Sequence, residues 1–117
     1  MELKEVMEQK SFVVVGDTLN EEKFAYKIKH AMLENGYEVQ CVGKELESIN
    51  DVDCEIDMID LCIRSDKGLA LMKECKKAFK GVVVQPGAES EELLGWLQEQ
   101  EIPYIESCLL RGLKQYK

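Results

Sequence analysis

The chain of 117 residues has 45% hydrophobic residues, enough for a core, and a formal charge of −8. Its length is typical of one domain, so we expect residues 1–117 to fold as a single unit. The shortage of Lys and Arg excludes a general nucleic-acid binder and disfavours an anionic membrane surface, because both ligands need a cationic surface. No apolar run is long enough to span a bilayer, and the start, Met1–Glu5, lacks the apolar core of a signal peptide.

The first predicted elements are a short helix and a buried strand. Met1–Gln9 carries Leu3, Val6 and Met7 at helical spacing, which predicts an amphipathic helix laid against a sheet. The apolar run Phe12–Val15 does not alternate with polar residues and ends at Gly16, as is typical of a strand buried on both faces.

A polar loop, Asp17–Asn20, separates this strand from a predicted helix that ends at Asn35-Gly36. Thr18 with Glu21 fits a capping box for this helix, and Asn20 is an alternative cap. The predicted buried stripe of the helix is Phe24, Ile28, Ala31 and Met32.

Four further strands are predicted, each with a helix or a polar loop before the next. They are 37–42, 58–63, 82–84 and 103–105. Residues 44–54 are polar and irregular, with one short turn. The later helices are expected to start at Ser65 or Asp66, at Ser90 and at Ser107. The first of these is expected to carry Leu69, Met72, Cys75 and Phe79 on one side and to end at Lys80-Gly81.

Five strands alternating with helices predict an α/β fold, a doubly wound parallel five-stranded sheet in a Rossmann-like three-layer sandwich. In such sheets ligands bind outside the carboxyl ends of the strands. The loop after Gly16 then lies at a helix N-terminus, where free N–H groups and the helix dipole favour an anion.

Three cations near the predicted strand ends are candidates for phosphate contacts. Lys23 lies in the first turn of a helix, where the dipole disfavours a cation unless an anion is nearby; the alternative is a solvated lysine. Arg64 ends a strand and can aim its forked donors at a phosphate, or instead pair with Asp66 or Asp60. Lys44 can reach the same crevice or lie on the surface.

Other chemistries have little support in the sequence. A single glycine at Gly16 does not make a dinucleotide fingerprint, and no Walker-type phosphate loop is present. The only histidine, His30, falls in mid-helix, so neither a catalytic triad nor a zinc or other metal site is expected. The five cysteines lack paired spacing and are expected to be mostly reduced core residues, which points to the cytoplasm. Cys108, at a strand end, could meet a ligand thiol.

Taken in order, several stretches resemble the CoA-binding protein family, small Rossmann-like domains similar to the CoA-binding domain of the succinyl-CoA synthetase alpha chain. No single motif is diagnostic, but the ordered set is, and it covers nearly the whole chain. The stretches are Phe12–Gly16, Glu22–Tyr26, Asn35–Val39, Asp57–Asp60 leading to Arg64, Val84–Ser90, and Ile102–Ile105 leading to Cys108.

The resemblance implies that coenzyme A or an acyl-CoA lies across the strand ends. Gly16, Asp17 and Thr18 would approach its phosphates with Lys23 nearby, and Val42, Gly43 and Lys44 would flank the adenosine half. Arg64 and the loop Gln85, Pro86 and Gly87 would line the other side. The chain departs from the family pattern where it has Gly16-Asp17-Thr18 in place of a Gly-Ala-Ser type loop, and Val42-Gly43-Lys44 in place of Val-Asn-Pro.

The function expected from the sequence is therefore non-catalytic binding of a small nucleotide ligand, CoA or an acyl-CoA. One alternative is a protein-interaction or regulatory module that keeps the fold and has lost or changed the ligand. Another is a ligase-type CoA domain whose partner chain supplies a phosphorylatable histidine. No protein partner is identified by the sequence.

Overall fold

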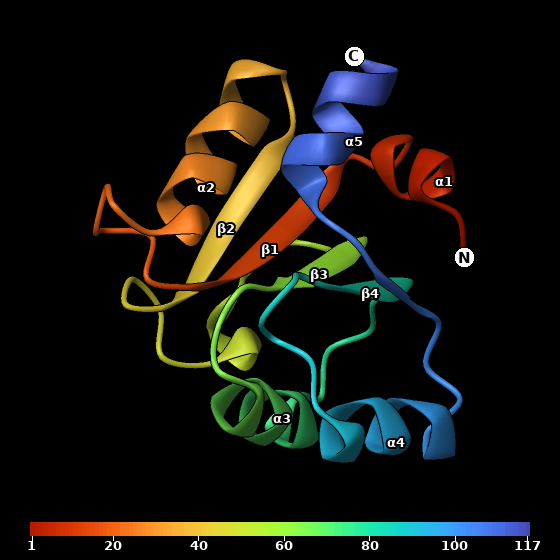
Figure 1. The fold of residues 1–117 in the computed structure, drawn as a ribbon. Helices are drawn as coiled ribbons and strands as arrows, with labels where there is room; N and C mark the ends of the chain where they lie inside the picture. Colours follow the sequence, from red (N-terminus) through yellow and green to blue (C-terminus); the bar gives the residue numbers. More distant parts are fainter.

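One five-stranded parallel sheet forms the centre of the computed structural model, which describes all residues from 1 to 117. The strand order is β2-β1-β3-β4-β5, so the predicted doubly wound α/β fold is confirmed (Figure 1). The strands are β1 (Ser11–Gly16), β2 (Glu38–Gly43), β3 (Met58–Leu61), β4 (Gly81–Val84) and β5 (Tyr104–Glu106).

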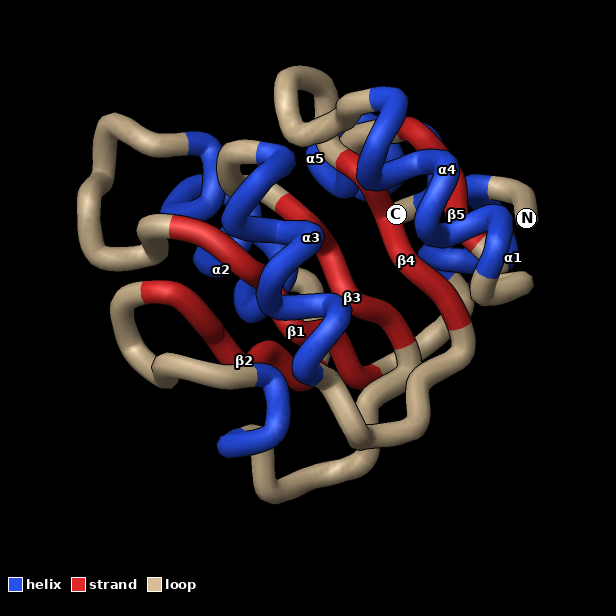
Figure 2. Tube along the Cα trace, turned by 90° about the horizontal axis from the view of Figure 1, so that it is seen from below, coloured by secondary structure: helices blue, strands red, loops and turns tan.

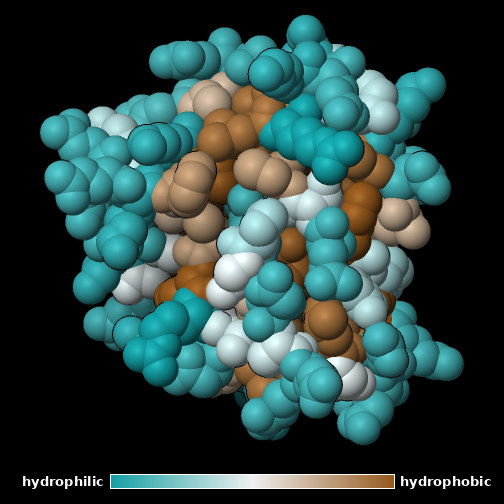
Figure 3. All heavy atoms as spheres, viewed as in Figure 1, coloured by the Kyte–Doolittle hydropathy of each residue, from teal (hydrophilic) through white to brown (hydrophobic).

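Helices cover both faces of the sheet and complete the predicted three layers. In Figures 1 and 2, α1, α2 and α5 lie on one face, and α3 and α4 lie on the other. The helices are α1 (Leu3–Met7), α2 (Phe24–Glu34), α3 (Ser65–Glu74), α4 (Glu91–Glu99) and α5 (Leu109–Tyr116), with a 3₁₀ turn, η1, at Ile49–Asp51. Polar side chains cover most of the outer surface in the view of Figure 3, and apolar patches appear between them.

The central strand β1 is buried along its whole length, as its unalternated apolar run predicts. Val13 and Val15 belong to the apolar cluster that includes Leu69 of α3 and Leu93 of α4. Phe12 and Val14 belong to the cluster on the opposite face, with residues of α1, α2 and α5. Both faces of β1 therefore contribute to the core.

The start of α2 differs from the prediction. The helix begins at Phe24 after the N-cap residue Lys23, and no side chain caps it. The predicted capping box is wrong, because α2 starts well after Thr18, whose hydroxyl donates to Glu45. The alternative cap, Asn20, accepts a hydrogen bond from the backbone N–H of Glu22 (3.0 Å) in the irregular loop before the helix. Phe24 is 63% exposed, so it does not belong to the buried stripe; Ala25 takes that position.

Other element ends were predicted with mixed success. Ser90 caps α4 as expected, since its Oγ accepts from the backbone N–H of Leu93 at 3.0 Å. In contrast, α3 ends at Glu74 and not near Lys80, and no side chain caps its N-terminus. The predicted Ser107 cap is also wrong, because Cys108 is the N-cap residue of α5 and makes no side-chain cap bond.

Asp60 is a polar residue buried in the middle of β3. Its side chain is fully inaccessible, and neither carboxyl oxygen has a hydrogen-bond partner. Its register neighbours, Val14 and Val83, belong to the apolar cluster on the α1, α2 and α5 face. Burial in this apolar site raises the pKa of Asp60 well above its usual value, because the charged form loses its hydration.

We expect Asp60→Asn to stabilise the protein increasingly as the pH rises. The raised pKa means that folding takes up a proton, so the contribution of Asp60 is fully present below pH 3.8 and is lost as the pH rises toward the folded-state value. The loss approaches about 1.4 kcal/mol per pH unit. The free energy of unfolding, measured with urea, should therefore favour the variant over wild type more at pH 7 than at pH 5. The same difference between variant and wild type at both pH values would contradict a buried neutral carboxyl.

Candidate ligand-binding site

A crevice opens at the carboxyl ends of β1 and β3, where the strand order reverses direction. The chain passes from β2 back over β1 to β3, and this switch point is where open α/β sheets bind ligands. The ends of β1 and β2 lie at the left of Figure 1, beside the projecting loops 17–23 and 44–48.

Two adjoining hollows occupy this crevice and share Asp17 and Ile63. The first, the Arg64 hollow, has a volume of about 320 Å³; the second, the Lys44 hollow, has about 400 Å³. The Arg64 hollow is lined by Asp17, Lys23, Phe24, Ala25, Cys62, Ile63, Arg64, Pro86, Gly87 and Ala88. The Lys44 hollow is lined by Gly16, Asp17, Gly43, Lys44, Glu47, Ile63, Lys67, Ala70 and Leu71.

Two glycines allow the strand ends to come close together under the crevice. Gly16 and Gly43 are register partners at the last positions of β1 and β2, and both have positive φ, +156° and +126°. A Cβ on Gly16 would overlap the carbonyl oxygen of Cys62, and one on Gly43 would lie 2.8 Å from the carbonyl oxygen of Gly16. Any side chain at either position would push the strands apart or fill the crevice.

The crevice has a local charge opposite to that of the chain. Four cations line it, Lys23, Arg64, Lys44 and Lys67, against two acids, Asp17 and Glu47. Four minus two gives a local charge of +2, whereas the whole chain carries −8. A site of this kind can bind an anion although the rest of the protein repels one.

Arg64 lies at the rim of its hollow with its side chain 77% exposed. Its Nε is 3.3 Å from a carboxyl oxygen of Asp66, one of the two pairings considered from the sequence. An ion pair this exposed contributes little to stability, and it leaves the other guanidinium donors available to a ligand.

Three of the residues expected to face the ligand have buried side chains instead. Thr18 is 1% exposed, Val42 is fully buried in the core, and Gln85 is 4% exposed. The Gln85 side chain accepts a hydrogen bond from the backbone N–H of Leu109 at 3.0 Å, so it caps α5 in place of Ser107. None of the three lines either hollow. The remaining eight expected residues, Gly16, Asp17, Lys23, Gly43, Lys44, Arg64, Pro86 and Gly87, do line them.

The Thr18 side chain holds the loop after β1 in place. Its hydroxyl donates to Glu45 Oε2 at 2.5 Å, and Lys29 of α2 contacts the same oxygen at 2.8 Å. Burial alone would raise the pKa of Glu45, but the hydrogen bonds from Lys29 and Thr18 outweigh it and lower that pKa. The network therefore connects the loop after β1 with α2 and with the loop after β2, on both sides of the Lys44 hollow.

We expect Glu45→Gln to destabilise the protein at pH 7 by about 0.5–1 kcal/mol, the scale of a partly exposed ion pair. Because the folded-state pKa of Glu45 is lowered, its stabilising effect is present above pH 4.5 and lost as the pH falls through the folded value. The free energy of unfolding, measured with urea, should thus be lower for the variant than for wild type at pH 7, and this difference should shrink at pH 3.5. Glu47→Gln, which changes a nearby exposed glutamate without such contacts, is the control; equal effects of the two variants would contradict the network.

A thiol lies in the Arg64 hollow, but it is not the one expected from the sequence. Cys62 follows the end of β3 and lines the hollow, whereas Cys108 does not. Burial raises the pKa of Cys62 to about 12, with smaller effects of Asp60 and Cys108. The Cys62 side chain therefore stays a neutral thiol at physiological pH, and a neutral thiol is a weak nucleophile.

Several lining residues were missed by the sequence analysis. Phe24 was assigned to a buried helix stripe and Ile63 to the last position of a predicted strand, so their exposure to the crevice was not expected. Lys67, Ala70 and Leu71 share one face of α3 at helical spacing, and that spacing was the available signal.

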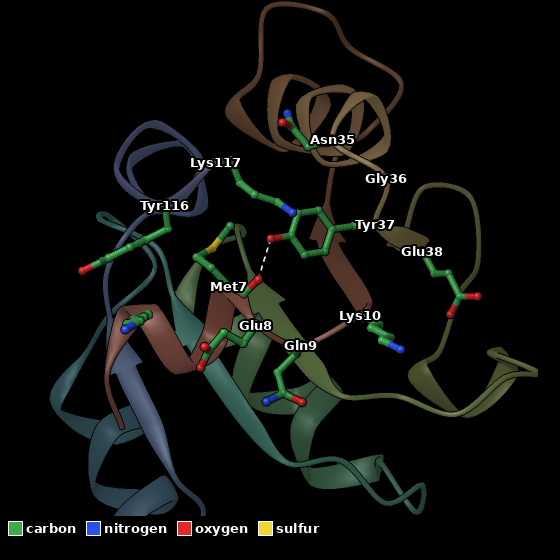
Figure 4. Close-up of a pocket in the computed structure, with 11 residues that line it drawn as sticks. Met7, Glu8, Gln9, Lys10, Asn35, Gly36, Tyr37, Glu38, Tyr116 and Lys117 are labelled. Atoms are coloured by element: carbon green, nitrogen blue, oxygen red, sulfur yellow. Dashed lines mark hydrogen bonds between the residues drawn. The ribbon is translucent and has the colours of Figure 1, made fainter.

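A separate hollow of about 600 Å³ lies at the opposite, amino end of the sheet (Figure 4). It borders Lys10 and Glu38, which precede β1 and begin β2. There the Tyr37 hydroxyl donates to the carbonyl oxygen of Met7 at 2.6 Å, and Lys117 lies 4.8 Å from the centre of the Tyr37 ring. These contacts hold the chain ends against β2, and the hollow lies away from the switch point.

No three His, Cys, Asp or Glu side chains are grouped closely enough to hold a metal ion. His30 is exposed on α2, where its ring lies 4.2 Å from the Tyr26 ring between centroids, with the two planes tilted by 46°. None of the helices combines the length and apolar character needed to cross a bilayer.

Comparison with known proteins identifies the family. The family model of the CoA-binding domain matches residues 10–113, which includes the whole sheet and the crevice. The chain belongs to the CoA-binding domain family. No curated protein sequence matches the chain. The resemblance found in the sequence is therefore confirmed.

Solved structures support the fold. A conserved hypothetical protein from Pyrococcus furiosus is 26% identical, with a TM-score of 0.76, over 88% of this chain and 98% of its own. A hypothetical protein from Pyrococcus horikoshii is 20% identical with a TM-score of 0.84, covering 97% and 88%. A Thermus thermophilus protein is also 20% identical, with a TM-score of 0.76 over 98% of both chains. At this identity the last two show similarity of fold alone.

Proposed function

We propose that this CoA-binding domain protein binds coenzyme A or an acyl-CoA in the crevice at the strand ends, without catalysing a reaction on it. The observation that carries the proposal is the local charge of +2 at the switch point of a chain with a charge of −8. CoA carries a pyrophosphate and a 3′-phosphate, and cations gathered at one crevice suit a ligand with several phosphates.

The two hollows suit the two halves of CoA. In our proposal the adenosine half, with its 3′-phosphate, lies in the Lys44 hollow near Gly43, Lys44 and Lys67. The pyrophosphate crosses the loop after Gly16, within reach of Lys23. The pantetheine arm enters the Arg64 hollow, past Arg64 and the loop at Pro86 and Gly87. Because the side chains of Thr18, Val42 and Gln85 are buried, these residues would influence the ligand only through the backbone conformation of the strand ends and loops to which they belong.

The chemistry of the crevice favours a carrier or sensor over an enzyme. The Cys62 thiol has a pKa raised to about 12 and is thus a weak nucleophile. The two acids of the crevice, Asp17 and Glu47, line the Lys44 hollow together with the cations Lys44 and Lys67. We propose that residues 1–117 act as one unit in this role.

We expect CoA to stabilise the purified protein and Arg64→Ala to weaken its binding. A ligand at about 100 times its Kd adds roughly 2.7 kcal/mol to the free energy of unfolding, which is visible in a melt. Losing one charge-assisted contact costs roughly 1.5–3 kcal/mol of binding free energy, measured by calorimetry. Native mass spectrometry of the protein as purified would identify any ligand that is retained.

Arg111→Ala is the matched control for this experiment, because Arg111 is the other arginine of the chain and is exposed on α5. Equal affinities for the two variants would remove Arg64 from the site. If CoA, acetyl-CoA and ADP all leave the melting temperature unchanged, the proposal fails and a protein-interaction module becomes the better account.

We expect Asp17→Asn to tighten CoA binding. Asp17 lines both hollows, and its carboxylate accepts a hydrogen bond from the backbone N–H of Leu19 at 3.2 Å. An asparagine keeps an acceptor oxygen and removes a charge that repels phosphate by about 1 kcal/mol or more at about 4 Å. Calorimetry should show a gain in affinity that is largest at low salt, with little change in the stability of the free protein. Weaker binding would mean that the carboxylate accepts a hydrogen bond from the ligand.

A further inference from the structure

Phe24 exposes an aromatic ring on the wall of the candidate site. It is the first residue of α2 and lines the Arg64 hollow, although its side chain is 63% exposed. The next residue, Ala25, fills the core position on this turn. The ring thus adds little to the core, and the backbone directs it toward the crevice.

The surroundings of the ring divide into a charged rim and an apolar wall. Lys23 and Arg64 provide cations at the hollow, and Lys27 lies 5.4 Å from the centre of the Phe24 ring, within the range of a cation–π contact. Ala25, Ile63 and Ala88 give the remaining wall an apolar character. A ligand matching this hollow has negative charge at one end and an apolar group at the other.

The hollow has open space on the side of the loop after β4. Pro86 and Gly87 are both exposed, and a Cβ added to Gly87 would meet no atom within 4 Å. The Cys62 thiol, held neutral, adds a weakly polar surface to the lining of the hollow and no charge. An apolar group can therefore enter beside this loop without displacing protein atoms, and the thiol adds no charge for it to bury.

We propose that Phe24 is a specificity-determining residue that packs against the acyl group of a short-chain acyl-CoA. The inference rests on the proposed function, because the phosphates must first be held by the cations of the crevice. Free CoA would place only its pantetheine arm in the hollow and leave part of the ring exposed to water, and an acyl chain of a few carbons would cover more of it. The protein thus prefers an acyl-CoA to free CoA.

The test is calorimetric titration of the full chain with CoA, acetyl-CoA and butyryl-CoA. Wild type should bind butyryl-CoA about tenfold more tightly than CoA, the scale of burying two methylene groups. In Phe24→Ala the ratio of the butyryl-CoA affinity to the CoA affinity should fall close to one, while the CoA affinity itself changes little. Phe24→Leu should keep part of the preference for butyryl-CoA.

Leu19→Ala is the matched control. Leu19 is also 63% exposed and belongs to the same loop region, but it does not line the hollow. Its variant should keep the wild-type ratio. The role of Phe24 would be overturned, and the proposed function would stand, if wild type bound CoA and butyryl-CoA equally well. The same holds if both alanine variants lost the preference for butyryl-CoA to the same extent. Absence of binding by every thioester and by CoA would overturn the proposed function with it.

Discussion

The close approach of three strand ends at Gly16 is the constraint on which the crevice depends. Gly16 lies against the carbonyl oxygen of Cys62 on one side and pairs with Gly43 on the other. Because neither glycine carries a side chain, the backbone at the switch point stays open to a ligand. The apolar strand β1, buried on both faces, fixes this point in the centre of the molecule.

Around that point the protein has buried polar side chains that hold loops in place and exposed cations. Thr18 and Gln85 follow strand ends, yet their side chains anchor the loops, one to Glu45 and the other to the start of α5. Lys23, at the end of the loop after β1, and Arg64, which follows β3, stay exposed. Thr18 and Gln85 are buried and use their hydrogen bonds within the protein, whereas the exposed cations have donors that face solvent.

Much of the fold could be predicted from the sequence, because each strand has an unalternated or β-rich run and each crossover except the one from β2 to β3 has a helical pattern. The Val-rich run of β1 and the Ser90 cap were confirmed. The start of α2 was not, because Thr18 and Asn20 are both good caps by residue type, and only tertiary contacts with Glu45 show that Thr18 is occupied elsewhere. The same limit applies to Ser107, whose expected role is taken by a residue far away in sequence, Gln85.

The candidate site could be located from the sequence but not resolved into side-chain directions. Parallel topology alone brings the loops after β1, β2, β3 and β4 to one edge of the sheet. Which residues face the crevice depends on small shifts in element ends. Because α2 begins at Phe24, that ring lies at the crevice and Ala25 lies in the core. Lys67 was missed because candidate residues were sought only near the ends of strands, and Lys67 lies on the side of α3.

The central claim is that the ligand of this CoA-binding domain protein occupies the carboxyl edge of the sheet. Amide chemical shifts followed during titration with CoA test it most directly, since every loop reports its own contact. The account predicts shifts at Gly16, Asp17, Gly43, Ile63 and Gly87, and none at the amino-end hollow near Lys10 and Tyr37. Shifts confined to the amino-end hollow would contradict it.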